Sequence, residues 1–207
     1  MRDEGTIKFQ ADFEISHPLS SPAVTELIAA RNRLFARGLI GVYPDGISFG
    51  NLSLRASHPG DGHPGFFITG TQTGYIENLD ESHIAFADRC DIHANYLRST
   101  GPIQASSEAM THYMIYSVDP EINAVVHVHS PEMWKYWMDR APTTGRDVPY
   151  GTPEMAGAVE DLVLQRPSEE AAGFLVMAGH EDGVMSYGVN LDAAMELILE
   201  KAKEAGV

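Results

Sequence analysis

The feature that most constrains the fold is the segment of residues 124–129, AVVHVH, which follows an Asp-Pro-Glu turn. A run of β-branched residues after a turn predicts a buried β-strand. Because side chains alternate along a strand, His127 and His129 share one face, with Cα atoms about 6.5–7 Å apart, and Val126 and Val128 share the other. Two imidazoles on one side of a rigid strand suit a divalent metal ion such as zinc.

The preceding residues, 106–118, are predicted to form a helix with Ser106 as its N-cap and Glu108 in its first turn. This helix would bring a carboxylate, His112 and the hydroxyls of Ser106 and Ser107 close to the two histidines. Each motif also has an ordinary explanation, since His-x-His pairs are often packed or surface residues and Ser-Ser is a common helix cap. A metal site therefore requires a third ligand from elsewhere.

The length of 207 residues and the hydrophobic content of 43% predict one domain over residues 1–207. Neither an apolar leader nor a run of transmembrane length is present, and the single cysteine, Cys90, cannot form an internal disulfide. We therefore expect a soluble, cytoplasmic protein.

The net charge of −15 argues against nucleic acid or an anionic membrane as a partner. The chain has 14 Lys and Arg residues in all, and none lies within residues 56–88 or 99–134. An anion bound by these segments would have to be held by hydroxyls, backbone N–H groups and a metal ion.

The first half of the chain supplies two further candidate loops. Residues 21–41 are predicted to form an amphipathic helix without a catalytic role, with Arg31 on its polar face. Residues 46–55 are predicted to form a glycine turn followed by a strand. Asn51 is either a turn residue of this segment or a residue whose side chain approaches a bound anion. Residues 65–74 read as a strand that ends in alternating Thr and Gly, including Thr73 and Gly74, which permits close approach to a ligand. His93, between two later strands, is expected to be a surface residue.

The second half supplies the third histidine. Helices are predicted at residues 131–140, at 152–164 with Thr152 as N-cap, and at 191–203 with Asn190 as N-cap. Between the last two, residues 173–178 are predicted to form a buried strand, and His180 follows directly after its end. Residues 184–187 are predicted to form another short strand. His180 is thus the candidate for the third ligand.

As a set, these motifs resemble the class II aldolase/adducin family over most of the chain. The matching segments are, in family order, residues 50–55 (GNLSLR), 68–74, 106–112, 124–130 (AVVHVHS), 151–152 and 180–183. The resemblance implies an α/β fold, a three-layer α/β/α sandwich around a mixed, largely antiparallel central sheet. It also implies a homo-oligomer, with a tetramer as the expected state.

The resemblance assigns roles residue by residue. His127, His129 and His180 match the family's zinc ligands, and manganese or cobalt could replace zinc; no organic cofactor is implied. Glu108 matches the acidic residue that transfers protons beside the metal. The residues that match the phosphate-binding site are Asn51, Ser53, Thr73, Gly74, Ser106 and Ser107.

The function implied is a zinc-dependent aldolase, an aldehyde-lyase that makes or breaks a carbon–carbon bond in a phosphorylated sugar or hydroxyketone through a metal-chelated enediolate. A sugar-phosphate 4-epimerase and a methylthioribulose-phosphate dehydratase remain as alternatives on the same site. Less expected is a non-enzymatic interaction module like the adducin head, which has no need of the three histidines and Glu108. Also less expected is a cupin, because the predicted helices do not suit its all-β barrel.

The chain departs from the family pattern in two places near the site. The segment of residues 130–151 is short, so that Tyr150 and Tyr136 are only candidates for the tyrosine that family members contribute across a subunit interface. Glu181 and Asp182 follow His180 where the family has glycine, and either carboxylate could compete for the metal.

Overall fold

An eight-stranded sheet organises the computed structural model, which describes residues 5–167 and 169–207. Its strand order is β1-β7-β6-β5-β4-β8-β10-β9. Neighbouring strands are antiparallel except for the parallel pair of β1 and β7. The strands are β1 (Gln10–Ile15), β4 (Asn51–Ser57), β5 (Pro64–Thr69), β6 (Ile84–Asp91), β7 (Tyr96–Gly101), β8 (Ala124–His129), β9 (Ala172–Val176) and β10 (Gly183–Gly188).

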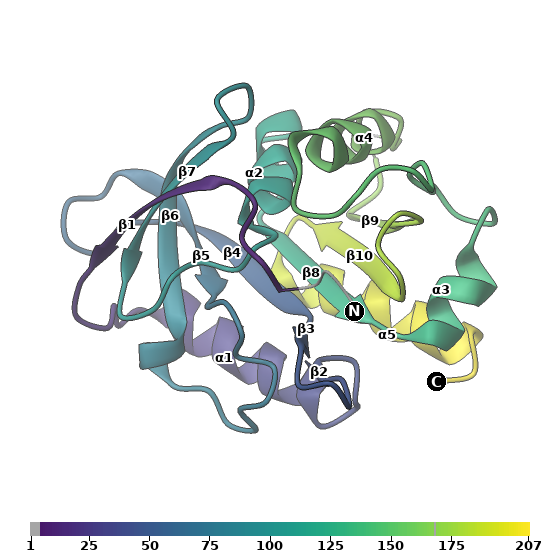
Figure 1. Cartoon of the computed structure of the whole chain (residues 1–207), viewed down its shortest axis with the longest axis horizontal. Helices are drawn as coiled ribbons and strands as arrows, with labels where there is room; N and C mark the ends of the chain where they lie inside the picture. Colours follow the sequence, from purple (N-terminus) through teal and green to yellow (C-terminus); the bar gives the residue numbers. More distant parts are fainter. Residues whose placement is uncertain (1–4, 168) are drawn as a thin grey trace.

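Helices cover both faces of this sheet (Figure 1). One face carries α1 (Pro22–Phe35), α3 (Pro131–Trp137) and α5 (Leu191–Glu204), and the other carries α2 (Ala109–Val118) and α4 (Pro153–Leu164). The arrangement is a three-layer α/β/α sandwich around a mixed, largely antiparallel sheet, which confirms the predicted fold class. That residues 1–207 form a single domain stays a prediction.

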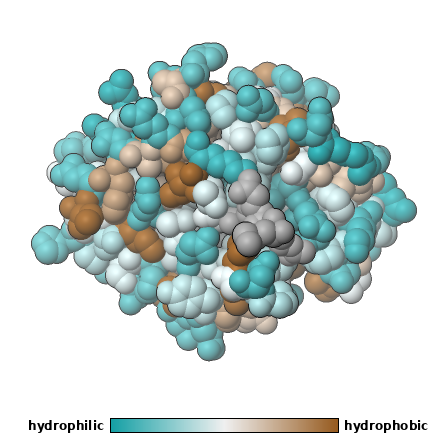
Figure 2. All heavy atoms as spheres, viewed as in Figure 1, coloured by the Kyte–Doolittle hydropathy of each residue, from teal (hydrophilic) through white to brown (hydrophobic). Residues whose placement is uncertain are grey.

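Each face of the sheet has its own hydrophobic cluster. Val126 and Val128 of β8 join the cluster beneath α1 and α5, whereas Val125 joins the one beneath α2 and α4. This alternation is the one expected for a strand buried on both faces. On the outer surface seen in Figure 2, hydrophilic residues predominate and hydrophobic ones are scattered. None of the helices in the described residues is long and apolar enough to cross a membrane.

Two of the three predicted helix caps, Thr152 and Asn190, are found, and Ser21 caps α1 in the same way. The side chains of Ser21, Thr152 and Asn190 accept hydrogen bonds from the backbone N–H groups of Val24, Met155 and Ala193. Pro occupies the first turn of α1 and α4, where its missing N–H costs no hydrogen bond.

Helix α2 begins later than predicted. Its first residue is Ala109, Glu108 occupies the N-cap position, and Ser106 lies outside the helix. The backbone at Glu108 has φ −97° and ψ 3°, so residues 106–108 form a turn that leads into the helix. This turn frees Ser106, Ser107 and Glu108 from helical geometry at the end of the sheet.

Arg31 is the second correction, because it lies in the interior and not on the polar face of α1. Its side chain is 1% exposed and donates hydrogen bonds to the carbonyl oxygens of Thr73 (2.8 Å), Glu77 (3.1 Å) and Ile76. Burial lowers the pKa of Arg31 to about 10, so it is still charged at pH 7. A buried cation is tolerated where carbonyl groups surround it, and here it anchors the loop of residues 73–77.

The short strands β2 (Gly41–Val42) and β3 (Ser48–Phe49) form a separate two-stranded hairpin beside the main sheet. Gly74 lies so close to it that an added Cβ would be 2.0 Å from the carbonyl oxygen of Gly41. Only glycine fits there, and the loop of residues 73–77 thereby packs against the hairpin.

A candidate metal centre and anion site

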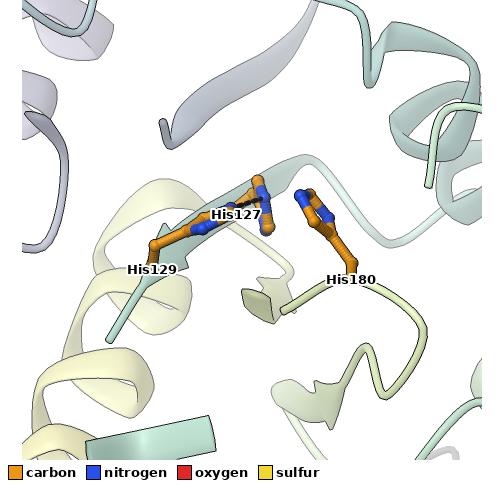
Figure 3. Close-up of side chains that lie close together, drawn as sticks. All are labelled: His127, His129 and His180. Carbon is orange, nitrogen blue, oxygen red and sulfur yellow. Dashed lines mark hydrogen bonds between the residues drawn. The ribbon is translucent and has the colours of Figure 1, made fainter. Parts of the chain in front are cut away.

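Three histidines from two segments meet at one end of the sheet (Figure 3). His127 and His129 come from β8, and His180 comes from the turn between β9 and β10. One ring nitrogen of each lies within 4.8 Å of the others, and all three residues are buried. The turn is held in place by the backbone N–H of His180, which donates to Met177 O (3.0 Å), and by that of Gly183, which donates to His180 O (2.9 Å).

The hydrogen bonds of the two strand histidines fix which nitrogens face the cluster. The Nδ1 atom of His127 lies 3.1 Å from the carbonyl oxygen of Val184, which can only accept, so Nδ1 carries the proton. The Nδ1 atom of His129 lies 2.8 Å from Tyr43 Oη, and Tyr43 donates to Asp182 Oδ2 at 3.1 Å. His129 therefore donates from Nδ1 as well, and both histidines turn an unprotonated Nε2 toward the cluster.

This arrangement concentrates lone pairs in a small volume. The two Nε2 atoms lie 2.9 Å apart, and Glu108 Oε2 lies 3.2 Å from Nε2 of His127. Glu108 Oε1 lies 3.2 Å from Nδ1 of His180. Facing lone pairs repel one another unless a cation lies between them, so the donor set fits a divalent metal ion such as zinc.

The protonation states support the same conclusion. Burial lowers the pKa of His127 to about 4, which leaves the ring neutral and able to bind a metal ion at pH 7. Burial alone would raise the pKa of Glu108, but the charge that His127 carries at low pH and the close approach of His180 outweigh it and lower that pKa to about 2. Glu108 is therefore an ionised carboxylate.

The cluster forms one wall of a cavity whose other walls, among the described residues, carry no charged side chain. The described residues that line it outside the cluster are Gly5, Ser48, Phe49, Gly50, Asn51, Gly70, Thr71, Gln72, Thr73, Gly74, Ser106, Ser107 and Tyr150. None of these is Lys or Arg. Asn51 reaches the cavity because it pairs with His127 in the β4–β8 ladder, and its buried Oδ1 has no hydrogen-bond partner among the described residues. An unsatisfied buried acceptor beside the cluster indicates a place for a ligand.

The structure thus brings together all but one of the predicted site residues. Ser53 lies elsewhere, because it is two residues further along β4 and beneath α2. Its hydroxyl is buried and lies 2.7 Å from both His112 Nδ1 and Tyr116 Oη. The position of Ser53 does not support the prediction that it binds phosphate.

The carboxylates that follow His180 do not enter the cluster. Asp182 turns away and accepts the hydrogen bond from Tyr43, with its backbone at a positive φ of 68°. Glu181 is exposed. Tyr150 stacks on His180 with ring centroids 4.5 Å apart, whereas Tyr136 is exposed and contacts Trp137.

Sequence reasoning missed Tyr43, whose hydroxyl holds the ring of His129. Tyr43 lies in the turn between β2 and β3, and its ring packs against Phe49 at 4.5 Å. No local signal marks it, because its contact with His129 depends on how the hairpin folds over the end of β8.

Comparison with known proteins identifies the family of the chain. Residues 25–205 match the family model described as the class II aldolase and adducin N-terminal domain. The chain therefore belongs to the class II aldolase/adducin family. No curated protein sequence matches it.

Several solved structures share the fold. An L-fuculose 1-phosphate aldolase is 23% identical, with a TM-score of 0.62 and coverage of 90% of this chain and 84% of that one. The L-fuculose-1-phosphate aldolase of Thermus thermophilus is 20% identical, with a TM-score of 0.63 and coverage of 89% and 91%. A putative aldolase/epimerase/decarboxylase of Klebsiella pneumoniae is 19% identical, with a TM-score of 0.62 and coverage of 88% and 86%. At these identities the comparisons show the fold.

Proposed function

We propose that the chain is a metal-dependent aldolase, an aldehyde-lyase that acts on a phosphorylated sugar or hydroxyketone. The observation that carries this proposal is the convergence of three imidazoles and an ionised carboxylate at the wall of a cavity lined by neutral hydrogen-bond donors. Membership of the class II aldolase family and the fold shared with two L-fuculose-phosphate aldolases support it.

His127, His129 and His180 would hold the metal ion, which we take to be zinc, with manganese or cobalt as replacements. When bound, the ion supplies Lewis acidity toward a substrate carbonyl. The three ligands are all neutral imidazoles, so the ion would keep its full positive charge and at least one open position. This arrangement suits a catalytic site better than a closed structural one.

Glu108 would transfer the proton. Its carboxylate is ionised, 2% exposed and within 3.2 Å of two of the proposed ligands, so it lies next to any substrate that reaches the metal. A carboxylate there accepts a proton from a carbon next to the carbonyl, or from a hydroxyl during carbon–carbon cleavage. The turn of residues 106–108 places the Glu108 carboxylate at the wall of the cavity.

The phosphate would be held by neutral donors, namely the hydroxyls of Ser106 and Ser107, the amide of Asn51 and the backbone of the Thr73–Gly74 loop. The Thr73 hydroxyl donates to Gly70 O at 2.9 Å, so Thr73 would contribute its backbone N–H. Arg31 would act on the phosphate indirectly, because it fixes this loop from behind through the Thr73 carbonyl. A homo-oligomer, with a tetramer as the expected state, and a cytoplasmic location remain proposals.

The test is a panel of phosphorylated sugars and hydroxyketones, incubated with the zinc-loaded protein while aldehyde release is followed. The proposal predicts release from at least one phosphorylated compound and much slower release from its dephosphorylated form. If the protein instead inverts a stereocentre or eliminates water without releasing aldehyde, the aldolase assignment is wrong and an epimerase or dehydratase on the same site replaces it.

A further inference from the structure

A second group of potential metal ligands lies at the far end of β4, in the β4–β5 turn. His58, Asp61 and His63 each offer one ligand atom, and these atoms lie within 4.8 Å of one another. Strand β4 begins at Asn51 beside the candidate active site and ends at Ser57, so roughly 20 Å of strand separates the two clusters. This second group belongs to no part of the proposed aldolase site.

The turn itself holds the three residues in place. The backbone N–H of His58 donates to His63 O (2.8 Å), and that of Gly62 donates to His58 O (2.9 Å). The Nδ1 atoms of His58 and His63 both face Asp61 Oδ1, at 3.1 Å for His58 and within hydrogen-bond distance for His63. The backbone N–H of Gly60 donates to His58 Nδ1 (3.2 Å), so this nitrogen is unprotonated, and a metal ion bound there would replace that hydrogen bond.

The neighbouring strands orient His63 from behind. Its other nitrogen, Nε2, lies 2.7 Å from Oδ2 of Asp88 on β6, whose side chain is 4% exposed. Asp88 in turn accepts two hydrogen bonds from Arg98 on β7, at 2.8 Å and 2.5 Å. A carboxylate that accepts from the rear nitrogen of a histidine is the usual support of a metal-binding imidazole, since it fixes the ring and raises its basicity.

We propose that His58, Asp61 and His63 form a second binding site for a divalent transition metal of the zinc class, supported by Asp88 and Arg98. Two imidazoles and one carboxylate are a donor set that zinc accepts, with water completing the coordination. The metal ion takes the place of the proton between His63 Nδ1 and Asp61, and it fastens the β4–β5 turn to β6.

Binding requires a small rearrangement. The rings of His58 and His63 are stacked, with centroids 5.0 Å apart and planes at 14°. A metal ion lies near the plane of each imidazole that binds it, so one ring must turn. The His58 and His63 side chains are 21% and 35% exposed, which leaves them room to do so.

The test is a zinc titration of the whole protein after removal of metal with a chelator, with the number of ions bound per chain measured by equilibrium dialysis. We expect the parent to bind one ion more than His58→Ala/His63→Ala. The variant His93→Ala removes an exposed histidine from the neighbouring β6–β7 turn and should bind as many ions as the parent. The variant His127→Ala/His129→Ala should keep the ion of the turn, which separates this site from the proposed aldolase site.

Two further variants complete the experiment. Asp61→Asn removes one ligand with little change in shape and should also lose the ion, which guards against misfolding of the double variant. Asp88→Asn should weaken binding at this site about 10- to 100-fold, because the ring of His63 loses its support. Equal numbers of bound ions in the parent, His58→Ala/His63→Ala and Asp61→Asn would overturn the proposal.

Discussion

Glu108 is the residue whose role separates an enzyme from a protein that merely binds metal. If Glu108 served only as the N-cap of α2, its charge would contribute about 0.3–1 kcal/mol, and Glu108→Gln would be nearly silent. As the proton-transfer group it contributes about 10²–10⁴ in rate. Gln keeps the shape but removes the basicity.

We therefore predict that Glu108→Gln binds zinc and substrate like the parent but loses turnover by about 10²–10⁴-fold. Exchange of the substrate's carbon-bound proton with solvent, followed by NMR, measures the step directly. Exchange at the parental rate would show that another group is the base. His112 is then a poor replacement, because burial lowers its pKa to about 3 and Ser53 occupies its Nδ1.

Tyr43 is predicted to position His129 and not to take part in the chemistry. Tyr43→Phe keeps the packing against Phe49 but removes the hydroxyl that contacts His129 Nδ1 and Asp182. Loss of such a contact behind a metal ligand typically costs about 10- to 100-fold in metal affinity. Competition with a zinc-binding dye measures this effect, and Tyr75→Phe, at a 66% exposed tyrosine, is the matched control. Unchanged affinity in Tyr43→Phe would remove Tyr43 from the site.

At the scale of elements, the loops at the end of the sheet decide whether a phosphate is held. Ser107 lies in the turn before α2, outside the helix, so its hydroxyl is not needed as a cap. We predict that Ser107→Ala weakens binding of a phosphorylated ligand by about 1–3 kcal/mol and leaves binding of the dephosphorylated form unchanged. Calorimetry with both ligands gives the two values. An equal loss for both would contradict the phosphate assignment.

Arg31 links helix α1 to the loop of residues 73–77. The hydrogen bond from Arg31 to Thr73 O fixes the peptide unit that joins Thr73 to Gly74. Because the C=O and N–H of one peptide unit point in opposite directions, the Gly74 N–H points away from Arg31. Arg31→Met leaves several buried carbonyls without partners, so we predict a loss of about 1–3 kcal/mol in unfolding free energy and a higher KM for the phosphorylated substrate. Denaturant unfolding and steady-state kinetics measure the two effects. Arg33→Met, at an exposed arginine of the same helix, should change neither.

Most helices and strands could be predicted because their signals are local. Helices α4 and α5 begin at the predicted caps, and β8 buries its valines on the predicted face. Arg31 and Ser53 could not be placed in this way, since what covers them comes from distant parts of the chain. For Arg31 this is the loop of residues 73–77, and for Ser53 it is the side chains of α2. The separation of Asp182 from the cluster depends likewise on Tyr43.

For the whole molecule, the central claim is that one end of the sheet binds a metal ion on which the reaction depends. The proposed ligands come from β8 and from the β9–β10 turn, and the proposed base comes from the turn before α2. These segments are held together by the β4–β8–β10 ladder and by the packing of α2 and α4 on the same face. The site is thus a property of the fold and not of any one motif.

The most direct test is aldehyde release from the best phosphorylated substrate by protein that has been stripped of metal and then given zinc. We predict that the stripped parent is inactive, that zinc restores it, and that His127→Ala/His129→Ala stays inactive with zinc while remaining folded by circular dichroism. Full turnover by the stripped parent, or recovery of the double variant to the parental rate, would contradict the account.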